Sequence, residues 1–234
     1  MSEHESTKIS RRHIMAASLG AAGLGAVGLA MESAAPTKDE DRRRKKVLVC
    51  IGDFSEGMET YYMVYRLMEE GIVPVVAAPS VKLLQMVVHD FDPQYTNYTE
   101  KLGYTIKTEA AFKDVNPGDY QGLLIPGGRG PEEIRQNKDA LKIVGHFLES
   151  ELPLGAMCHG PQLLWAARSM KGRKIAAYSG IRADVEAAGA VFVDKPVVVD
   201  GSVVTSRGWP DLPHFMPVFL RVLAGKEQAA ASRQ

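Results

Sequence analysis

Cysteine is scarce in this chain of 234 residues, which contains only Cys50 and Cys158. Two cysteines cannot hold a disulfide-dense scaffold together, and their spacing is not that of a zinc site. The chain also lacks a net charge, because 28 Lys and Arg residues balance 28 Asp and Glu residues. This balance gives no reason to expect nucleic acid or an anionic membrane surface as a partner.

No apolar run is long enough for a comfortable membrane span. The longest candidate, residues 14–30, is rich in Ala and Gly and follows the pair Arg11 and Arg12. The order Ser-Arg-Arg-x-Ile before such a run is typical of a twin-arginine export signal, with an ordinary secretory signal or an uncleaved membrane anchor as alternatives. We therefore expect residues 1–35 to engage the twin-arginine export machinery and to direct the protein to the periplasm or another extracytoplasmic compartment.

Residues 36–44 predict a polar linker and residues 226–234 a polar tail, which leaves one domain over residues 45–225. In this domain, short apolar runs alternate with segments of helical periodicity. That order predicts βαβ units and an α/β fold, a three-layer α/β/α sandwich with a mostly parallel sheet. The expected strands lie at residues 45–53, 72–80, 123–125, 152–158 and 174–177, the expected helices at 57–71, 140–149, 160–167, 181–188 and 212–223, with a helix start at Pro131 and a hairpin at 197–206.

The segment Val81–Tyr104 breaks the alternation, because polar and aromatic residues separate two short apolar runs. We expect an excursion from the sheet, with a strand or hairpin at residues 83–88 and then an irregular loop. His89, Asp90 and Asp92 in this loop are not interpreted as metal ligands, since a single histidine in a loop is more often solvated surface. The sequence predicts neither a metal nor a cofactor.

The residues around Cys158 follow the pattern small-x-nucleophile-x-small, with Ala156 and Gly160 as the small residues. This pattern is typical of a nucleophile elbow, where a strand turns straight into a helix. The turn strains the central residue, and bulky side chains two positions away would clash. We expect Cys158 to lie at the carboxyl edge of the sheet as a reactive thiolate, its pKa lowered by the following helix N-terminus, and Cys50 to be an inert core thiol.

A reacting thiol needs a proton partner, and the sequence offers two kinds. His159 is adjacent to Cys158, although neighbours on a sharp turn usually point apart. Glu59 begins the helix after the first strand, with Glu56 just before it, and both reach the same sheet edge as Cys158. A buried, protonated carboxyl there would hydrogen-bond the thiolate and could act as an acid or a base. The alternative is that either Glu is a charge favoured by the helix dipole.

Two glycines follow the strand that ends at Ile125. Gly127 and Gly128 allow backbone N–H groups to approach closely, and with the amide of His159 they predict an oxyanion hole. The alternative is an ordinary Gly-Gly turn between a strand and a helix.

The motifs "LLIPGGRGPEEIR", "AMCHGPQLL" and "VVVDGSVVTSRG" together resemble the ThiJ/PfpI superfamily, whose fold is class-I glutamine amidotransferase-like, and in particular its PfpI endopeptidase-like branch. The resemblance implies Cys158 as nucleophile, Glu59 as the carboxyl that contacts it, and His159 as its histidine. It also implies that Glu132 supplies an acid to the histidine of a neighbouring subunit. The expected partner is therefore a second copy, in a dimer or a hexamer.

Three functions remain open at this stage. The first is a cysteine hydrolase of the PfpI type, whose thiolate attacks the carbonyl of a peptide or amide bond. The second is a glyoxalase or deglycase, in which Cys158 adds to a reactive aldehyde and Glu59 carries the proton. The third is a stress-response chaperone or a redox sensor, in which Cys158 is oxidised and does not turn over.

Overall fold

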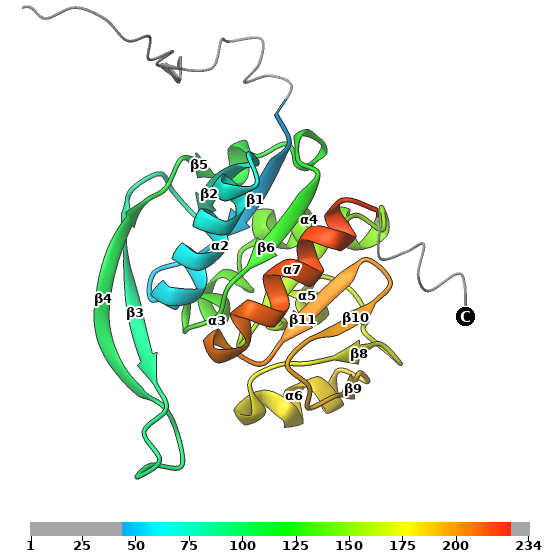
Figure 1. Ribbon diagram of the computed structural model, residues 1–234. Coiled ribbons are helices and arrows are strands. Elements are labelled where there is room, and N and C mark those ends of the chain that lie inside the picture. Colours follow the sequence, from blue (N-terminus) through cyan, green and yellow to red (C-terminus); the bar gives the residue numbers. More distant parts are fainter. Residues whose placement is uncertain (1–43, 226–234) are drawn as a thin grey trace, which may run out of the picture. The chain divides into compact units, whose positions relative to one another are not determined.

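The computed structural model describes residues 44–225 (Figure 1). The predicted export signal, almost all of the predicted linker and the predicted C-terminal tail lie outside these residues. The strands are β1 (Lys46–Cys50), β2 (Val73–Ala78), β3 (Leu83–Asp90), β4 (Thr99–Lys107), β5 (Ala110–Ala111), β6 (Gly122–Ile125), β7 (Leu154–Met157), β8 (Lys174–Ile175), β9 (Val191–Phe192), β10 (Val198–Asp200) and β11 (Val203–Ser206). The helices are α2 (Gly57–Glu69), α3 (Gly130–Ile134), α4 (Lys138–Glu149), α5 (Gln162–Ala167), α6 (Arg182–Ala187) and α7 (Leu212–Leu223).

Seven strands form the central sheet in the order β10-β11-β7-β6-β1-β2-β5. Neighbouring strands are parallel except β10 and β11, which form the predicted hairpin. β1 shows why its apolar run is continuous: Val47 and Val49 pack with α2 and α7, whereas Leu48 and Cys50 pack with α4 and α5 on the other face. Helices therefore cover both faces of the sheet (Figure 1), and the predicted three-layer α/β fold is confirmed.

The segment after β2 differs from its prediction. It forms an antiparallel hairpin of β3 and β4 outside the central sheet, and β3 runs on to Asp90 where an irregular loop was expected. β4 was not predicted because most of its side chains are exposed and only Ile106 is buried, so the alternating apolar pattern of a strand is missing. The loop that remains is the hairpin tip, residues 91–98.

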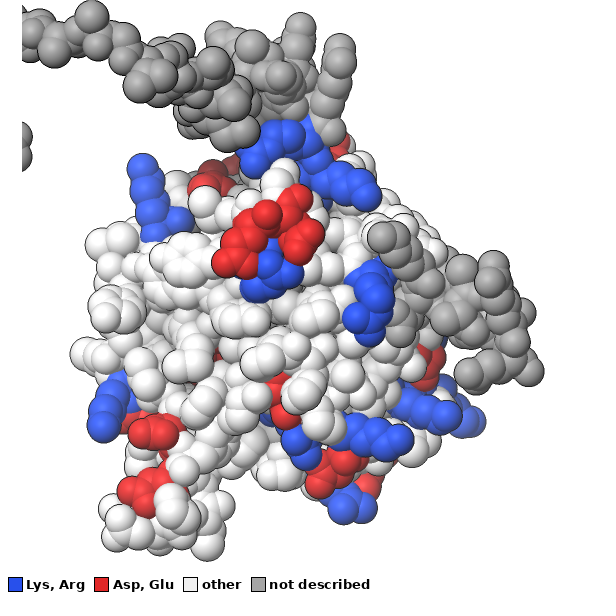
Figure 2. Space-filling model, in the orientation of Figure 1, with Lys and Arg blue, Asp and Glu red and all other residues white. Residues whose placement is uncertain are grey.

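The hairpin and α2 together present a face that is mostly uncharged, with charged side chains toward its edges (Figure 2). Large apolar or aromatic side chains are exposed there, among them Tyr65, Leu102 and Tyr104. Faces of this kind are typical of interaction surfaces. The predicted oligomer nevertheless stays a prediction.

No helix within residues 44–225 combines the length and apolar character that a membrane span requires.

Candidate active site

Cys158 is the first residue after β7 and has a φ of 56°, in the left-handed region that side chains rarely adopt. The predicted strain at a nucleophile elbow is therefore present. Gly160 explains the small residue two positions later, because a Cβ at that position would lie 2.3 Å from the carbonyl oxygen of Ile125 in β6. The chain can turn back toward the neighbouring strand only without a side chain at this position.

Gly127 brings the end of β6 against the elbow. A Cβ at Gly127 would lie 2.3 Å from Cys158 Cβ and 2.8 Å from Cys158 Sγ. The turn after β6 and the elbow after β7 thus meet at the carboxyl edge of the sheet, where open α/β folds place their ligands.

Replacing Gly127 with alanine is expected to lower the free energy of unfolding by about 3 kcal/mol, because the new methyl group overlaps backbone-anchored atoms. Urea denaturation measures the change. Gly118→Ala is the matched control, since its Cβ would meet only the Asn116 side chain at 3.6 Å. Equal stability of the two variants would show that the elbow accommodates the methyl group.

Two buried carboxyl groups lie next to the elbow. Glu56 caps α2, and its Oε2 accepts a hydrogen bond from the Glu59 amide at 2.7 Å. Glu59 Oε2 accepts one from the Gly127 amide at 2.5 Å, and the same carboxyl contacts the Cys158 side chain. Burial, and then the charge of Glu56, raise the pKa of Glu59 well above its usual value. Glu56 therefore caps the helix, and burial raises its pKa as well, whereas Glu59 faces the sulfur.

The backbone donors are arranged differently from the prediction. The Gly127 N–H is occupied by Glu59, so in this structure it does not serve as an oxyanion donor. The amides of Gly128 and His159 instead approach the sulfur of Cys158. These two N–H groups are the ones placed to hold an oxygen that develops negative charge beside the sulfur.

The expectation of a lowered Cys158 pKa is not met. Burial of the sulfur, and then the negative charge of Glu59, raise the pKa of Cys158 well above its usual value. The expected helix effect is weak because α5 starts only at Gln162 and has six residues. Burial raises the pKa of both Glu59 and Cys158, and the two groups, in contact with each other, titrate as a coupled pair.

His159 contacts Cys158 in the same chain, although adjacent residues on a turn were expected to point apart. Its Nδ1 lies 3.3 Å from Cys158 Sγ. Burial lowers the pKa of His159 to about 4, so the imidazole is neutral at neutral pH. The ring packs against both Tyr98 and Tyr178, with centroid distances of 6.0 Å and 5.2 Å. A neutral imidazole in this position accepts or relays a proton and carries no charge of its own.

His89 is a site residue that the sequence interpretation missed. The expectation of a solvated surface histidine was wrong, because His89 is buried, stacks on Tyr98 at 4.0 Å and pairs through Nε2 with Glu100 at 2.9 Å. Glu100 in turn accepts a hydrogen bond from Arg129 at 2.9 Å. The period-2 alternation of β3, in which Val87 and His89 are inward-facing, is the signal that would have found it.

Glu132 lies exposed in the first turn of α3. Its charge acts on His89 and Tyr98 of its own chain. The role that the sequence assigned to it, toward a histidine of a neighbouring subunit, stays a prediction. Among residues 44–225, no group of three or more His, Cys, Asp or Glu side chains is placed to hold a metal ion.

Known proteins are similar to this chain in sequence and in fold. A deglycase of Thermococcus kodakarensis is 38% identical over 178 residues, which cover 76% of this chain and 99% of the relative. The deglycase PfpI of Pyrococcus furiosus is 36% identical over the same shares of the two chains. Among solved structures, a ThiJ/PfpI domain protein of Brachyspira murdochii has a TM-score of 0.68 at 16% identity, covers 78% of this chain and 98% of its own, and shows the fold alone.

The family profile described as DJ-1/PfpI matches residues 45–222. The match includes the elbow, the glycine turn after β6 and the acidic start of α2. On this match and on the identity to its relatives, the chain belongs to the DJ-1/PfpI family.

Proposed function

We propose that this chain is a cysteine-dependent enzyme of the glyoxalase or deglycase kind, which acts on small reactive carbonyl compounds or their adducts. The names of its relatives support this alternative over the peptidase that was the first expectation from the sequence. The observation that carries the proposal is the setting of the nucleophile. Cys158 is only 3% exposed, beside a buried carboxyl group and two backbone donors.

The burial of Cys158 favours a small substrate. An extended peptide needs an open groove along the nucleophile, whereas the sulfur is buried and two tyrosines pack against the neighbouring His159. A small aldehyde needs only an approach to the sulfur and two donors for its oxygen. The amides of Gly128 and His159 supply the two donors.

The proposed reaction starts with Glu59 as general base. Its carboxylate takes the thiol proton of Cys158 as the sulfur adds to the aldehyde carbon of methylglyoxal, and the amides of Gly128 and His159 hold the oxygen. Glu59 then returns the proton to that oxygen, which gives a hemithioacetal. Neutral His159, 3.3 Å from the sulfur, orients the thiol and relays protons.

The second half of the reaction again uses Glu59. Its carboxylate moves the proton from the former aldehyde carbon to the neighbouring carbonyl carbon, and the hydroxyl proton of the hemithioacetal passes to the former ketone oxygen. The hemithioacetal thereby becomes a thioester of lactate. Water hydrolyses the thioester, which releases lactate and restores the thiol. One carbon is oxidised and its neighbour is reduced within the same molecule, so that the net change is addition of one water and no external redox partner is required.

A crossed substrate assay tests the proposal. The purified protein is expected to convert methylglyoxal to lactate, measured by lactate formation, and to leave a panel of peptide amides intact. Amide cleavage without lactate formation would replace the proposal with the peptidase. Activity on neither, with Cys158 oxidised by dilute peroxide, would replace it with a redox sensor.

A further inference from the structure

The tip of the β3–β4 hairpin, residues 91–98, contacts the loop that follows β8. The Tyr178 hydroxyl donates a hydrogen bond to Asn97 Oδ1 at 2.7 Å, and the Phe91 ring lies 6.3 Å from the Tyr178 ring between centroids. The backbone N–H of Tyr178 in turn donates to the carbonyl oxygen of Cys158 at 3.1 Å. The tip is therefore joined to the nucleophile elbow through one residue.

The base of the hairpin is held more firmly than its tip. The backbone N–H of Phe54 donates to the carbonyl oxygen of Gln85 at 2.7 Å. The backbone N–H of Val87 donates to the carbonyl oxygen of Ser55 at 3.0 Å. These bonds fix β3 to the loop before α2, whereas residues 93–97 of the tip are exposed. A movement that changes access to the site is therefore expected in the tip and not in the whole hairpin.

Tyr98, the last residue of the tip, reaches the reacting groups. Its ring stacks on His89 at 4.0 Å and meets the ring of His159 edge-on at 6.0 Å. Burial, and then a charge on Cys158, raise the pKa of Tyr98 to about 12, so that the hydroxyl is neutral at neutral pH and close enough to the sulfur to respond to its charge. Tyr98 thus lies beside a nucleophile that is only 3% exposed.

The surroundings of Tyr98 leave space for its ring to move. Tyr98 lines a cavity of about 500 Å³ that the hairpin tip encloses together with the segments 177–179 and 207–211. Its side chain is half-buried, and it is followed directly by β4. Rotation of a side chain at the surface is fast compared with turnover. The ring can therefore turn into the cavity while the strands of the hairpin stay paired.

We propose that Tyr98 determines the largest aldehyde that the enzyme accepts, because its ring covers the approach to Cys158 and leaves access only to small molecules. The covering of the sulfur stands on the contacts of the tip alone. Its consequence for turnover rests on the proposed function: methylglyoxal is accepted, and aldehydes with bulky substituents are rejected. The segment that breaks the alternation of strands and helices thereby sets the size limit of the site.

Alkylation of Cys158 by two reagents of different size tests the size limit without turnover. Iodoacetamide and iodoacetanilide react with a thiolate in the same way, but the second carries a phenyl ring. The ratio of their rates is independent of the ionised fraction of the thiol, so that a shifted pKa does not alter it. In Tyr98→Ala the advantage of iodoacetamide is expected to fall about tenfold. Mass spectrometry of the peptide that contains Cys158 measures both rates.

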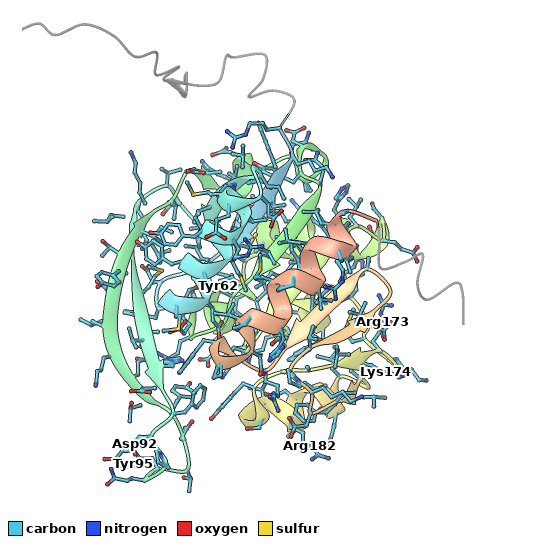
Figure 3. All side chains as sticks on the ribbon, in the orientation of Figure 1. Tyr62, Asp92, Tyr95, Arg173, Lys174 and Arg182 are labelled. Atoms are coloured by element: carbon cyan, nitrogen blue, oxygen red, sulfur yellow. The ribbon has the colours of Figure 1, made fainter. Side chains whose placement is uncertain are left out.

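Three further variants assign the effect to the ring of Tyr98. Tyr98→Phe keeps the ring and is expected to keep the ratio. Tyr98→Leu keeps a smaller apolar side chain and is expected to lower the ratio about threefold. Tyr95→Ala is the matched control, because Tyr95 lies at the same tip (Figure 3), is 62% exposed, and is expected to change nothing. Urea denaturation shows that each variant is folded.

Two aldehydes extend the comparison to turnover. Phenylglyoxal has the reacting carbons of methylglyoxal with a phenyl group in place of the methyl group, and the proposed reaction converts it to mandelate. Tyr98→Ala is expected to raise kcat/KM for phenylglyoxal relative to methylglyoxal about tenfold, and Tyr98→Phe to leave this ratio unchanged. A residue that merely supported the fold would lower both values of kcat/KM alike.

An unchanged alkylation ratio in folded Tyr98→Ala overturns the proposal, as does an equal fall in Tyr95→Ala. Tyr98→Leu decides in the same way if the alanine variant does not fold. A lowered ratio in a protein that forms no lactate keeps the size limit and removes the proposed reaction. Conversely, lactate formation with an unchanged alkylation ratio keeps the reaction and removes the size limit.

Discussion

Replacing Cys158 with serine is expected to lower turnover of methylglyoxal by about a thousandfold or more. A serine hydroxyl is far less acidic than a thiol, and Glu59 together with a neutral His159 cannot ionise it. The fold should be retained, because serine accepts the φ of 56° no worse than cysteine and meets the amides of Gly128 and His159. We expect the free energy of unfolding to change by about 1 kcal/mol or less. Lactate formation and urea denaturation measure the two quantities.

Cys50→Ala is the control for this experiment. Cys50 is buried in β1, and burial raises the pKa of its thiol far above its usual range, so that it does not react at neutral pH. The alanine variant is expected to keep full turnover. Retention of more than about a tenth of the activity in Cys158→Ser would show that another group forms the covalent bond.

The elbow was predictable because its cause is local. A sharp strand-to-helix turn excludes bulky side chains at fixed positions on either side of its central residue. The small residues Ala156 and Gly160 occupy those positions around Cys158. The distance of 2.3 Å between a Cβ at Gly160 and the oxygen of Ile125 gives its physical reason. The central sheet was predictable too, since strands that are buried on both faces have continuous apolar sequences.

The hairpin was only partly predictable, because one strand of it has little to bury. β4 packs mainly through Ile106, and its remaining residues follow no alternation. His89 was misinterpreted for the same reason. The alternation of β3 places His89 on its inner face, but the pairing of His89 with Glu100 follows only once β4 is recognised as the partner strand.

The electrostatics of the site depends on distances that no sequence pattern contains. The Gly-Gly turn predicted close backbone donors, but the structure assigns the Gly127 amide to Glu59. The elbow predicted a thiolate, but burial and Glu59 raise the pKa of Cys158. In both cases the missing information is the position of a carboxyl group from α2 relative to two loops, each more than 60 residues further along the chain.

Replacing Glu59 with glutamine is expected to change turnover and thiol acidity in opposite ways. Turnover of methylglyoxal should fall by a factor of about 100 to 10,000, because the amide can neither take the thiol proton nor move a proton between the two carbons. The pKa of Cys158 should fall, because the negative charge that raises it is removed while the two backbone donors remain. The rate of lactate formation and the pH dependence of Cys158 alkylation by iodoacetamide measure the two effects.

Glu69→Gln provides the matched control, since it makes the same chemical change at an exposed position on the same helix. Both turnover and alkylation are expected to match those of the unaltered protein. The opposite signs separate a proton carrier from a residue that merely supports the fold, because a general loosening of the elbow would lower turnover without a defined shift of the thiol titration. If the thiol titrated at a higher pH in Glu59→Gln, Glu59 would be a protonated donor to the sulfur at rest, and the general-base step proposed for it would be wrong.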